Sequence, residues 1–263
     1  MADMPMQAMS GMDLETLVKR FQEAAISSPD SETSPAQKNC EICNDTGWRY
    51  IDRNTVVRCS CQDVSNAKKR IADSGLQSVL KELTFDRFTV SENWQKGMFE
   101  IAESWTQAII GGDKPWMFFG GAVGSGKTHL CTAACGELLK AGIGVRYMLW
   151  PSESRQLRSC VTDMEAFEDL AYPLERARVL YIDDLFKTER GAKLGSVSTP
   201  EVKVAFEILD ARYRMNLPTI ISTEWMMSEL LELDEGTFSR VYQKSRRYIA
   251  EITRAPGRNM RIR

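Results

Sequence analysis

Residues 121–128 constrain this 263-residue chain more than any other part of its sequence. They read GAVGSGKT and match the pattern G-x-x-x-x-G-K-[ST], with an apolar run at 116–119 before them and a helical pattern after them. In this context the glycines let successive backbone N–H groups turn toward an anion at the start of a helix. The sequence therefore predicts a phosphate-binding loop between a buried strand and a helix.

The side chains of this loop also have chemical roles. Lys127 can reach the outer phosphates of a nucleoside triphosphate, and the Thr128 hydroxyl is a ligand for magnesium. His129, the only histidine, is interpreted as structural because the loop supplies the phosphate chemistry without it. The predicted nucleotide-binding residues are Gly121, Ala122, Val123, Gly124, Ser125, Gly126, Lys127, Thr128 and His129.

Four short apolar runs, at 116–119, 145–149, 179–182 and 219–222, alternate with helical patterns. This alternation favours a parallel sheet with ligands at the carboxyl ends of its strands. One helix is well marked, with Thr199 as its cap and its end near residue 216. Its predicted buried stripe consists of Val202, Ala205, Phe206 and Leu209.

Polar side chains follow two of the predicted strands. Asp183 and Asp184 end the run at 179–182, where Asp183 is expected to hold magnesium and Asp184 to polarise an attacking water. A helix cap or a turn is the alternative interpretation of this acidic pair. Thr223, with Ser222 as second choice, is the predicted sensor of the outer phosphate at the end of the next strand.

Four cysteines form a separate pattern, Cys40-x-x-Cys43 and Cys59-x-Cys61, around an alternating stretch at 48–57 that predicts a hairpin. Four thiolates suit a tetrahedral zinc ion. A module of this size cannot bury enough surface to fold unaided, so metal binding would provide much of its folding energy. Disulfides are the alternative, which a reducing compartment disfavours. The three other cysteines fall in apolar helical contexts and are predicted to be small core residues: Cys131, Cys135 and Cys160.

Composition and charge bound the remaining possibilities. No apolar run reaches the length of a membrane helix, and the Met-rich start lacks the basic region and apolar stretch of a signal peptide, so a cytoplasmic protein without membrane contact is expected. The net charge is −2, yet residues 240–263 carry eight basic residues against one acidic residue. Such an end can face phosphates or an acidic partner, although a solvated face is the commoner explanation for a run of charge.

The ordered set of motifs resembles the DnaC/DnaI helicase loaders of Gram-positive bacteria and their phages, which belong to the AAA+ ATPases. The resemblance covers residues 40–263 and includes the cysteine pattern, the phosphate-binding loop and the segments 74–76, 83–88, 182–186, 208–213, 217–223 and 239–240. It implies an α/β AAA+ core with a parallel sheet and flanking helices at 84–263. A small helical and zinc-ribbon-like domain at 1–83 would precede it, with a helix at 12–26, a zinc module at 40–61 and a connector helix at 65–83.

The resemblance also implies an activity and partners. The chain would be an ATPase, weak alone, that uses ATP, Mg²⁺ and Zn²⁺ and loads a hexameric DnaB-type replicative helicase onto single-stranded DNA. It would bind the helicase through its N-terminal domain and self-associate into a ring or spiral, hexameric with the helicase. Lys127, Asp183, Asp184 and Thr223 would act within one subunit and Arg240 on the neighbouring subunit, while Phe85 and Phe88 would lie near the adenine. The basic residues expected to contact DNA are Arg155, Arg158, Lys187, Arg190 and Lys193.

Two departures from the family pattern leave rival interpretations open. Asp184 stands where AAA+ proteins more often have glutamate, and Glu224 replaces an asparagine near the sensor. One rival is an IstB-type transposition ATPase, which shares the AAA+ core and remodels a transposase. The other is an adaptor that binds the helicase and hydrolyses little ATP.

Overall fold

A computed structural model of the chain describes residues 40, 42–43, 46–51, 55–62, 77–187 and 196–262. The predicted helix at 12–26, most of the connector at 65–83, and Arg190 and Lys193 lie outside these residues. The chain divides into two compact units, residues 1–59 and 60–263, and each is described by itself. In the first, strands β1 (Trp48–Tyr50) and β2 (Val56–Arg58) pair antiparallel, which forms the hairpin expected between the cysteine pairs.

The larger unit is built on a five-stranded sheet in the order β4-β5-β6-β3-β7. Every pairing between neighbouring strands is parallel, so the predicted α/β architecture is confirmed. The strands are β3 (Met117–Gly121), β4 (Val145–Leu149), β5 (Val179–Leu185), β6 (Thr219–Thr223) and β7 (Ile249–Ile252). The fifth strand, β7, was not among the apolar runs that the sequence analysis identified.

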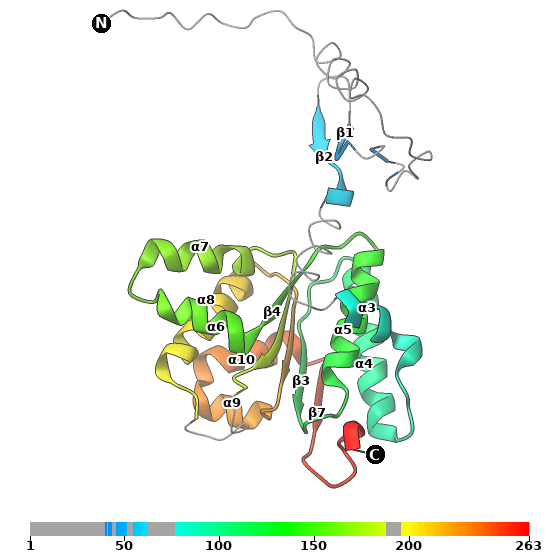
Figure 1. The fold of residues 1–263 in the computed structure, drawn as a ribbon, viewed down its shortest axis with the longest axis vertical. Helices are drawn as coiled ribbons and strands as arrows, with labels where there is room; N and C mark the ends of the chain where they lie inside the picture. The colour runs from blue at the N-terminus through cyan, green and yellow to red at the C-terminus, as the bar shows by residue number, and fades with distance from the viewer. Residues whose placement is uncertain are drawn as a thin grey trace, which may run out of the picture. The chain divides into compact units, whose positions relative to one another are not determined.

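Helices cover both faces of this sheet (Figure 1). One side carries α3 (Gln77–Glu82), the 3-10 turn η1 (Phe85–Arg87), α4 (Asn93–Ile110) and α5 (Lys127–Lys140). The other side carries α6 (Trp150–Ser159), α7 (Met164–Glu175), α8 (Thr199–Arg214), α9 (Met227–Leu233) and α10 (Glu235–Ser245). A second 3-10 turn, η2 (Met260–Ile262), ends the described chain. None of the helices in the described ranges has both the length and the apolar character that a membrane crossing requires.

Side chains alternate along each strand between two hydrophobic cores. Phe119 and Tyr181 pack in the core under α4 and α5, whereas their neighbours Phe118 and Ile182 pack in the core under α8 and α10. A strand that is buried on both faces reads as a continuous apolar run, which is why the sequence revealed four of the five strands. Both cores lie along the length of the sheet and hold its carboxyl edge in place.

Helix α8 differs slightly from its predicted form. Ser198, not Thr199, is its N-cap, and Ser198 and Glu201 form a reciprocal capping box. The buried stripe includes Ala205 and Leu209 as expected, but Val204 and Ile208 complete it in place of Val202 and Phe206. The stripe is therefore shifted around the helix, and the Phe206 side chain is 37% exposed.

Arg212 is a fully buried cation near the end of α8. Its guanidinium donates to the Thr219 hydroxyl at 2.9 Å and to the backbone carbonyls of Leu174, Glu175, Ala177 and Pro218. These acceptors lie at the end of α7 and at the start of β5 and β6, so one side chain joins three segments. An arginine is suited to this role because its planar fork presents five donors.

We expect the substitution Arg212→Ala to lower the free energy of unfolding by roughly 3–5 kcal/mol, because several buried oxygens lose their donor. Urea denaturation followed by circular dichroism measures this change. The control Arg214→Ala removes a side chain that is 71% exposed and paired with Asp210, and it should change the free energy by less than about 1 kcal/mol. Equal effects of the two substitutions would contradict the structural role of Arg212.

Candidate functional site

The loop that follows β3 has the backbone conformation that the motif requires. Gly121, Gly124 and Gly126 have φ angles of 94°, 69° and 90°, a region that costs other residues free energy. A Cβ atom at Gly121 would lie 2.1 Å from the Ile252 carbonyl oxygen, and one at Gly126 would lie 2.7 Å from the Phe88 ring. At these two glycines the loop therefore passes too close to its neighbours for a side chain, and it leads directly into the first turn of α5.

Lys127 is the first residue of α5 and is 7% exposed. Its ammonium group donates to the carbonyl oxygens of Gly121 and Ala122 at 2.9 and 2.6 Å. Burial lowers the pKa of Lys127 to about 8, while the charges of Glu224 and Asp184 oppose this change. The amine is held inside the loop, where a phosphate group would be its natural counter-charge.

Asp183 is buried at the end of β5 and accepts hydrogen bonds from three hydroxyl groups. Thr128 donates to it at 3.2 Å and Tyr147 at 3.1 Å, and Ser222 donates to the same oxygen as Thr128. Burial raises the pKa of Asp183, and the hydrogen bond from Ser222 counters that effect. The structure thus brings the two predicted magnesium ligands, Thr128 and Asp183, into direct contact.

A β-bulge between β5 and β6 positions the second carboxylate. Ile182 pairs with Ile221 and Leu185 with Thr223, so Asp183 and Asp184 together lie opposite Ser222 alone. Asp184 adopts a φ of 58°, a left-handed conformation that aspartate tolerates better than most residues. Because of the bulge, the two acidic side chains do not alternate between opposite faces of the sheet, and both remain at the carboxyl ends of the strands.

The two hydroxyl residues at the end of β6 occupy different environments. Ser222 contacts both acidic residues, because its hydroxyl donates to Asp183 and accepts from the Asp184 backbone N–H at 3.3 Å. The Thr223 hydroxyl instead donates to the Leu185 carbonyl at 2.7 Å and accepts from the Trp225 N–H at 3.2 Å. The second choice from the sequence thus lies against the acidic pair, and the first choice stabilises the adjoining turn.

Two charged residues of this region did not emerge from the motif analysis as parts of the site. Lys187 forms ion pairs with Asp184 at 2.8 Å and with Glu224 at 3.5 Å. Burial lowers the pKa of Lys187, but the hydrogen bond to Asp184 and the charge of Glu224 outweigh it and leave the pKa raised. One sequence signal pointed to Glu224, namely its place beside the predicted sensor, whereas Lys187 was expected to face DNA.

A cavity of about 310 Å³ opens at this edge of the sheet. Its lining includes the loop residues 123–129 together with Asp184, Lys187 and Glu224. Arg240 is not part of it: this residue lies within α10 rather than at a helix start, and its guanidinium faces Asp210 at 3.7 Å and the Tyr213 ring at 5.8 Å. The loop residues 123–129 and Asp184 thus line one cavity, Asp183 contacts Thr128 beside it, and Gly121 and Ala122 accept hydrogen bonds from Lys127.

One flank of the cavity is built by the segment before α4. His129 lies with its Nε2 atom 2.9 Å from the Thr84 carbonyl oxygen, and its ring meets Phe88 edge-to-face at 5.2 Å. Phe88 is buried against Gly126, whereas Phe85 packs edge-to-face on Phe99. His129 therefore has the structural contacts expected of it, and it also lines the cavity.

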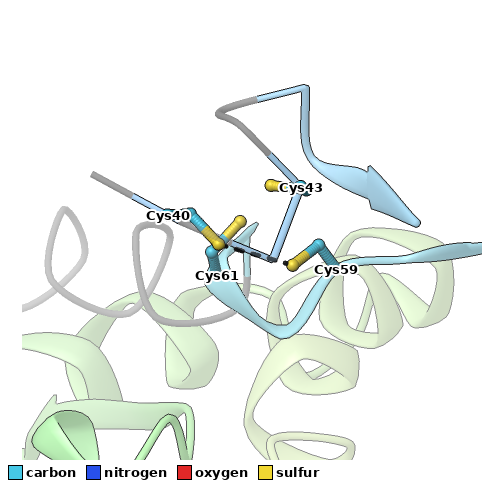
Figure 2. A group of neighbouring side chains, drawn as sticks. All are labelled: Cys40, Cys43, Cys59 and Cys61. Carbon is cyan, nitrogen blue, oxygen red and sulfur yellow. Dashed lines mark hydrogen bonds between the residues drawn. The ribbon is translucent and has the colours of Figure 1, made fainter. Parts of the chain in front are cut away.

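The four cysteines of the N-terminal pattern come together in a separate cluster (Figure 2). Their sulfur atoms all lie within 4.8 Å of one another, and those of Cys40 and Cys59 are 3.7 Å apart. The Gly47 N–H donates to the Cys43 sulfur at 3.3 Å, and the Cys59 N–H donates to the Gly47 carbonyl at 2.7 Å. Backbone hydrogen bonds thus connect the first cysteine turn to the second.

These distances fit a metal ion with four thiolate ligands. Zinc–sulfur bonds of about 2.3 Å in tetrahedral geometry hold sulfur atoms about 3.8 Å apart, close to the spacing of the cluster. A disulfide needs sulfur atoms at about 2.05 Å, whereas those of Cys40 and Cys59 are 3.7 Å apart. The cluster is therefore compatible with the zinc-ribbon-like region that the sequence predicts.

Thiol reactivity tests the cluster directly. We expect a thiol reagent to modify Cys160 at once, because it is partly exposed, and to reach the four cluster cysteines only after a chelator removes zinc. Cys131 and Cys135 should react only on unfolding, because burial raises the pKa of both thiols. The control Cys160→Ser should abolish the fast phase alone. Immediate reaction of the cluster cysteines, or protein purified without zinc, would contradict a metal site.

Comparison with known proteins extends these observations. No protein-family profile matches the sequence. The phage-like element PBSX protein XkdC of Bacillus subtilis (strain 168) is 26% identical over 244 residues, which cover 89% of this chain and 90% of XkdC. The uncharacterised protein YqaM of the same organism is 29% identical over 201 residues, 74% of this chain and 63% of YqaM.

Solved structures share the fold of the larger unit. A crystal structure of the DnaC helicase loader matches 64% of this chain and 96% of its own with a TM-score of 0.55, and one of DnaI matches 69% and 93% with a TM-score of 0.51, both at 20% identity. AMPPCP-bound DnaA from Aquifex aeolicus matches 64% of this chain at 20% identity and a TM-score of 0.51, and the match spans 49% of the DnaA chain. The chain therefore has the AAA+ fold of the DnaC and DnaI helicase loaders and of DnaA, which confirms at the level of the fold the resemblance seen in its sequence.

Proposed function

We propose that this protein is an ATPase that loads a hexameric DnaB-type helicase onto single-stranded DNA. The observation that carries the proposal is the cavity in which the glycine-rich loop, Lys127 and the acidic end of β5 meet. These groups supply N–H donors, a cation and metal ligands, which a magnesium-bound triphosphate requires. The similarity to DnaC and DnaI supports the choice of loader over other AAA+ functions.

Each residue then has a defined role. The N–H groups of residues 121–128 and Lys127 hold the phosphates, and Thr128 and Asp183 would hold Mg²⁺, which when bound would neutralise charge on the transferred group. Asp184 orients the attacking water, and Glu224 presents a second carboxylate to the same cavity. Lys187 forms ion pairs with both carboxylates and offsets part of their negative charge in the cavity.

Ser222 is proposed to sense the outer phosphate, because its hydroxyl forms hydrogen bonds with both Asp183 and Asp184. Ser222→Ala should lower ATP turnover by about 10–100-fold, the usual effect of removing a group that orients a metal ligand. Thr223→Val should leave turnover of the folded enzyme near that of the wild type and lower the free energy of unfolding by about 1 kcal/mol. Steady-state phosphate release and urea denaturation measure the two effects, and the opposite pattern would assign the sensor role to Thr223.

Arg240 is proposed to complete the site of a neighbouring subunit, because it lies outside the cavity of its own chain and is 39% exposed. Lys127→Ala and Arg240→Ala should each reduce turnover with helicase and DNA present, by up to about 10³-fold for the arginine. Mixing the two variants should restore activity, since Arg240 of the first can act on the intact loop of the second.

Phosphate release in the mixture tests this shared site. The matched control is Lys244→Ala mixed with Lys127→Ala, because Lys244 lies on the same helix and also contacts the Tyr213 ring, at 5.8 Å. Lys244→Ala alone should retain turnover. No restoration in the Arg240 mixture, or equal loss in Lys244→Ala, would reject the shared site.

A second candidate, a helicase-binding adaptor with little hydrolysis, is favoured by one observation. Asp184 is shorter than the usual glutamate and is paired with Lys187 at 2.8 Å, which limits its ability to polarise water. The turnover of the wild type with helicase and single-stranded DNA distinguishes the two candidates. Turnover no greater than that of Lys127→Ala, together with intact helicase binding in a pull-down, would select the adaptor.

The DNA contacts belong to the same proposal. Arg155 is exposed on α6, whereas Arg158 lies 3.9 Å from Glu201 on α8 and Lys187 is paired with two carboxylates. Arg155 is thus the candidate among these three that has the greatest freedom to meet a phosphate. Binding to single-stranded DNA should weaken with salt, by a slope of about −0.7 per neutralised phosphate.

A further inference from the structure

Glu224 is a buried acidic residue that directly follows β6. It is 8% exposed, and it lines the cavity at the carboxyl edge of the sheet together with Asp184 and Lys187. Its backbone carbonyl accepts a hydrogen bond from the Arg254 guanidinium at 2.8 Å, which fixes this part of the chain. A carboxylate is rarely buried to this degree unless a partner or a ligand compensates the loss of water. The groups that face it therefore indicate its role.

One lysine connects this carboxylate to the end of the neighbouring strand. Lys187 forms an ion pair with Glu224 at 3.5 Å and a shorter one with Asp184 at 2.8 Å. Because β5 and β6 are adjacent in the sheet, the two carboxylates approach the same part of the cavity from adjacent strands. The two departures from the family pattern thus contact one lysine. They differ in reach, since glutamate is longer than aspartate by a methylene group.

A second lysine relates Glu224 to the place of the outer phosphates. Burial lowers the pKa of Lys127, and the largest effect that opposes it is the charge of Glu224, ahead of the charges of Asp184 and Asp183. Glu224 therefore acts more strongly than either aspartate on the amine that is proposed to hold the phosphates. Its carboxylate thus lies close to the position at which ATP would be cleaved.

The two aspartates of the site are held more tightly than Glu224. Asp183 accepts hydrogen bonds from three hydroxyl groups and is the proposed magnesium ligand. Asp184 has the shorter contact with Lys187, and the β-bulge fixes its backbone. Glu224 combines the longer contact with the longer side chain. Of the three carboxylates it is therefore the best placed to turn toward a water molecule at the outer phosphate.

We infer that Glu224 is a catalytic carboxylate that accepts the proton of the attacking water, while Asp184 orients that water. This inference rests on the proposed function, because it assumes that ATP is hydrolysed in the cavity. The water oxygen forms a bond to the γ-phosphorus, and the bond from that phosphorus to the bridging oxygen breaks. The electron pair of the broken bond leaves with ADP, and the proton of the water passes to Glu224, which acts as a general base.

The substitution Glu224→Gln separates proton transfer from binding, because glutamine keeps the shape of the side chain but is a poor proton acceptor. The rate of hydrolysis should fall by about 10²–10⁴-fold, the usual contribution of a general base. The affinity for MgAMPPCP should not fall. Single-turnover hydrolysis of MgATP with the full chain in excess measures the rate, and isothermal titration calorimetry with MgAMPPCP measures the affinity. Affinity lost in parallel with the rate would indicate a structural role and overturn the inference.

Further variants distinguish a failure of this inference from a failure of the proposed function. Glu232→Gln changes an exposed carboxylate on α9 outside the cavity and should alter neither quantity. Asp184→Asn should lower the rate by less than Glu224→Gln, since the proton acceptor remains. If the wild type hydrolyses MgATP, an undiminished rate in Glu224→Gln, or an equal or larger loss in Asp184→Asn, would overturn the inference alone. A wild type that binds no MgAMPPCP, or hydrolyses MgATP no faster than Lys127→Ala, would overturn the proposed function with it.

Discussion

Three hydroxyl groups that donate to Asp183 connect the parts of the site to one another. Thr128 begins α5, Tyr147 lies on β4 and Ser222 ends β6, so a single carboxylate at the end of β5 joins a helix and two neighbouring strands. A buried carboxylate is costly unless donors surround it, and these donors fix its orientation. Substitution of any of the three would disturb the position of the others, because all share one acceptor.

The charges around the cavity balance one another over short distances. Lys127 and Lys187 face Asp184 and Glu224, and these carboxylates oppose the effect of burial, which lowers the pKa of Lys127 to about 8. A bound triphosphate would bring negative charge into the cavity, and its metal ion would bring positive charge. The β-bulge is what makes the arrangement possible, since it places consecutive aspartates on the same edge of the sheet.

Much of this architecture followed from the sequence, because its signals are local. The strand at 145–149 was predicted with the bounds that β4 has, and the phosphate-binding loop follows β3 as its motif requires. Strand β7 was missed because it has only four residues and includes Glu251, so it does not form an apolar run. The predicted buried stripe of α8 differs from the observed one by about one position around the helix. Phe206 was included because it is apolar, but its position on the helix leaves it outside the core.

The features that the sequence did not reveal depend on contacts between distant segments. No local pattern in the sequence shows that Ser222, and not Thr223, contacts the acidic pair. The β-bulge determines this contact, because it changes the register of β5 against β6. The contact of Met260 with Gly124 joins residues that are far apart in the chain, and only the parallel pairing of β7 with β3 brings them together. Arg240 was expected at a helix start and lies inside α10, and the role proposed for it requires an adjacent subunit.

The central claim is that a magnesium-bound triphosphate lies between the loop at 121–128 and Asp183. A crystal structure of the protein with Mg²⁺ and the non-hydrolysable analogue AMPPCP tests it most directly. The account predicts density for the phosphates along the backbone N–H groups of the loop, with the metal ion between Thr128 and Asp183. Density for the analogue at another place, or an empty loop at a saturating concentration of analogue, would contradict it.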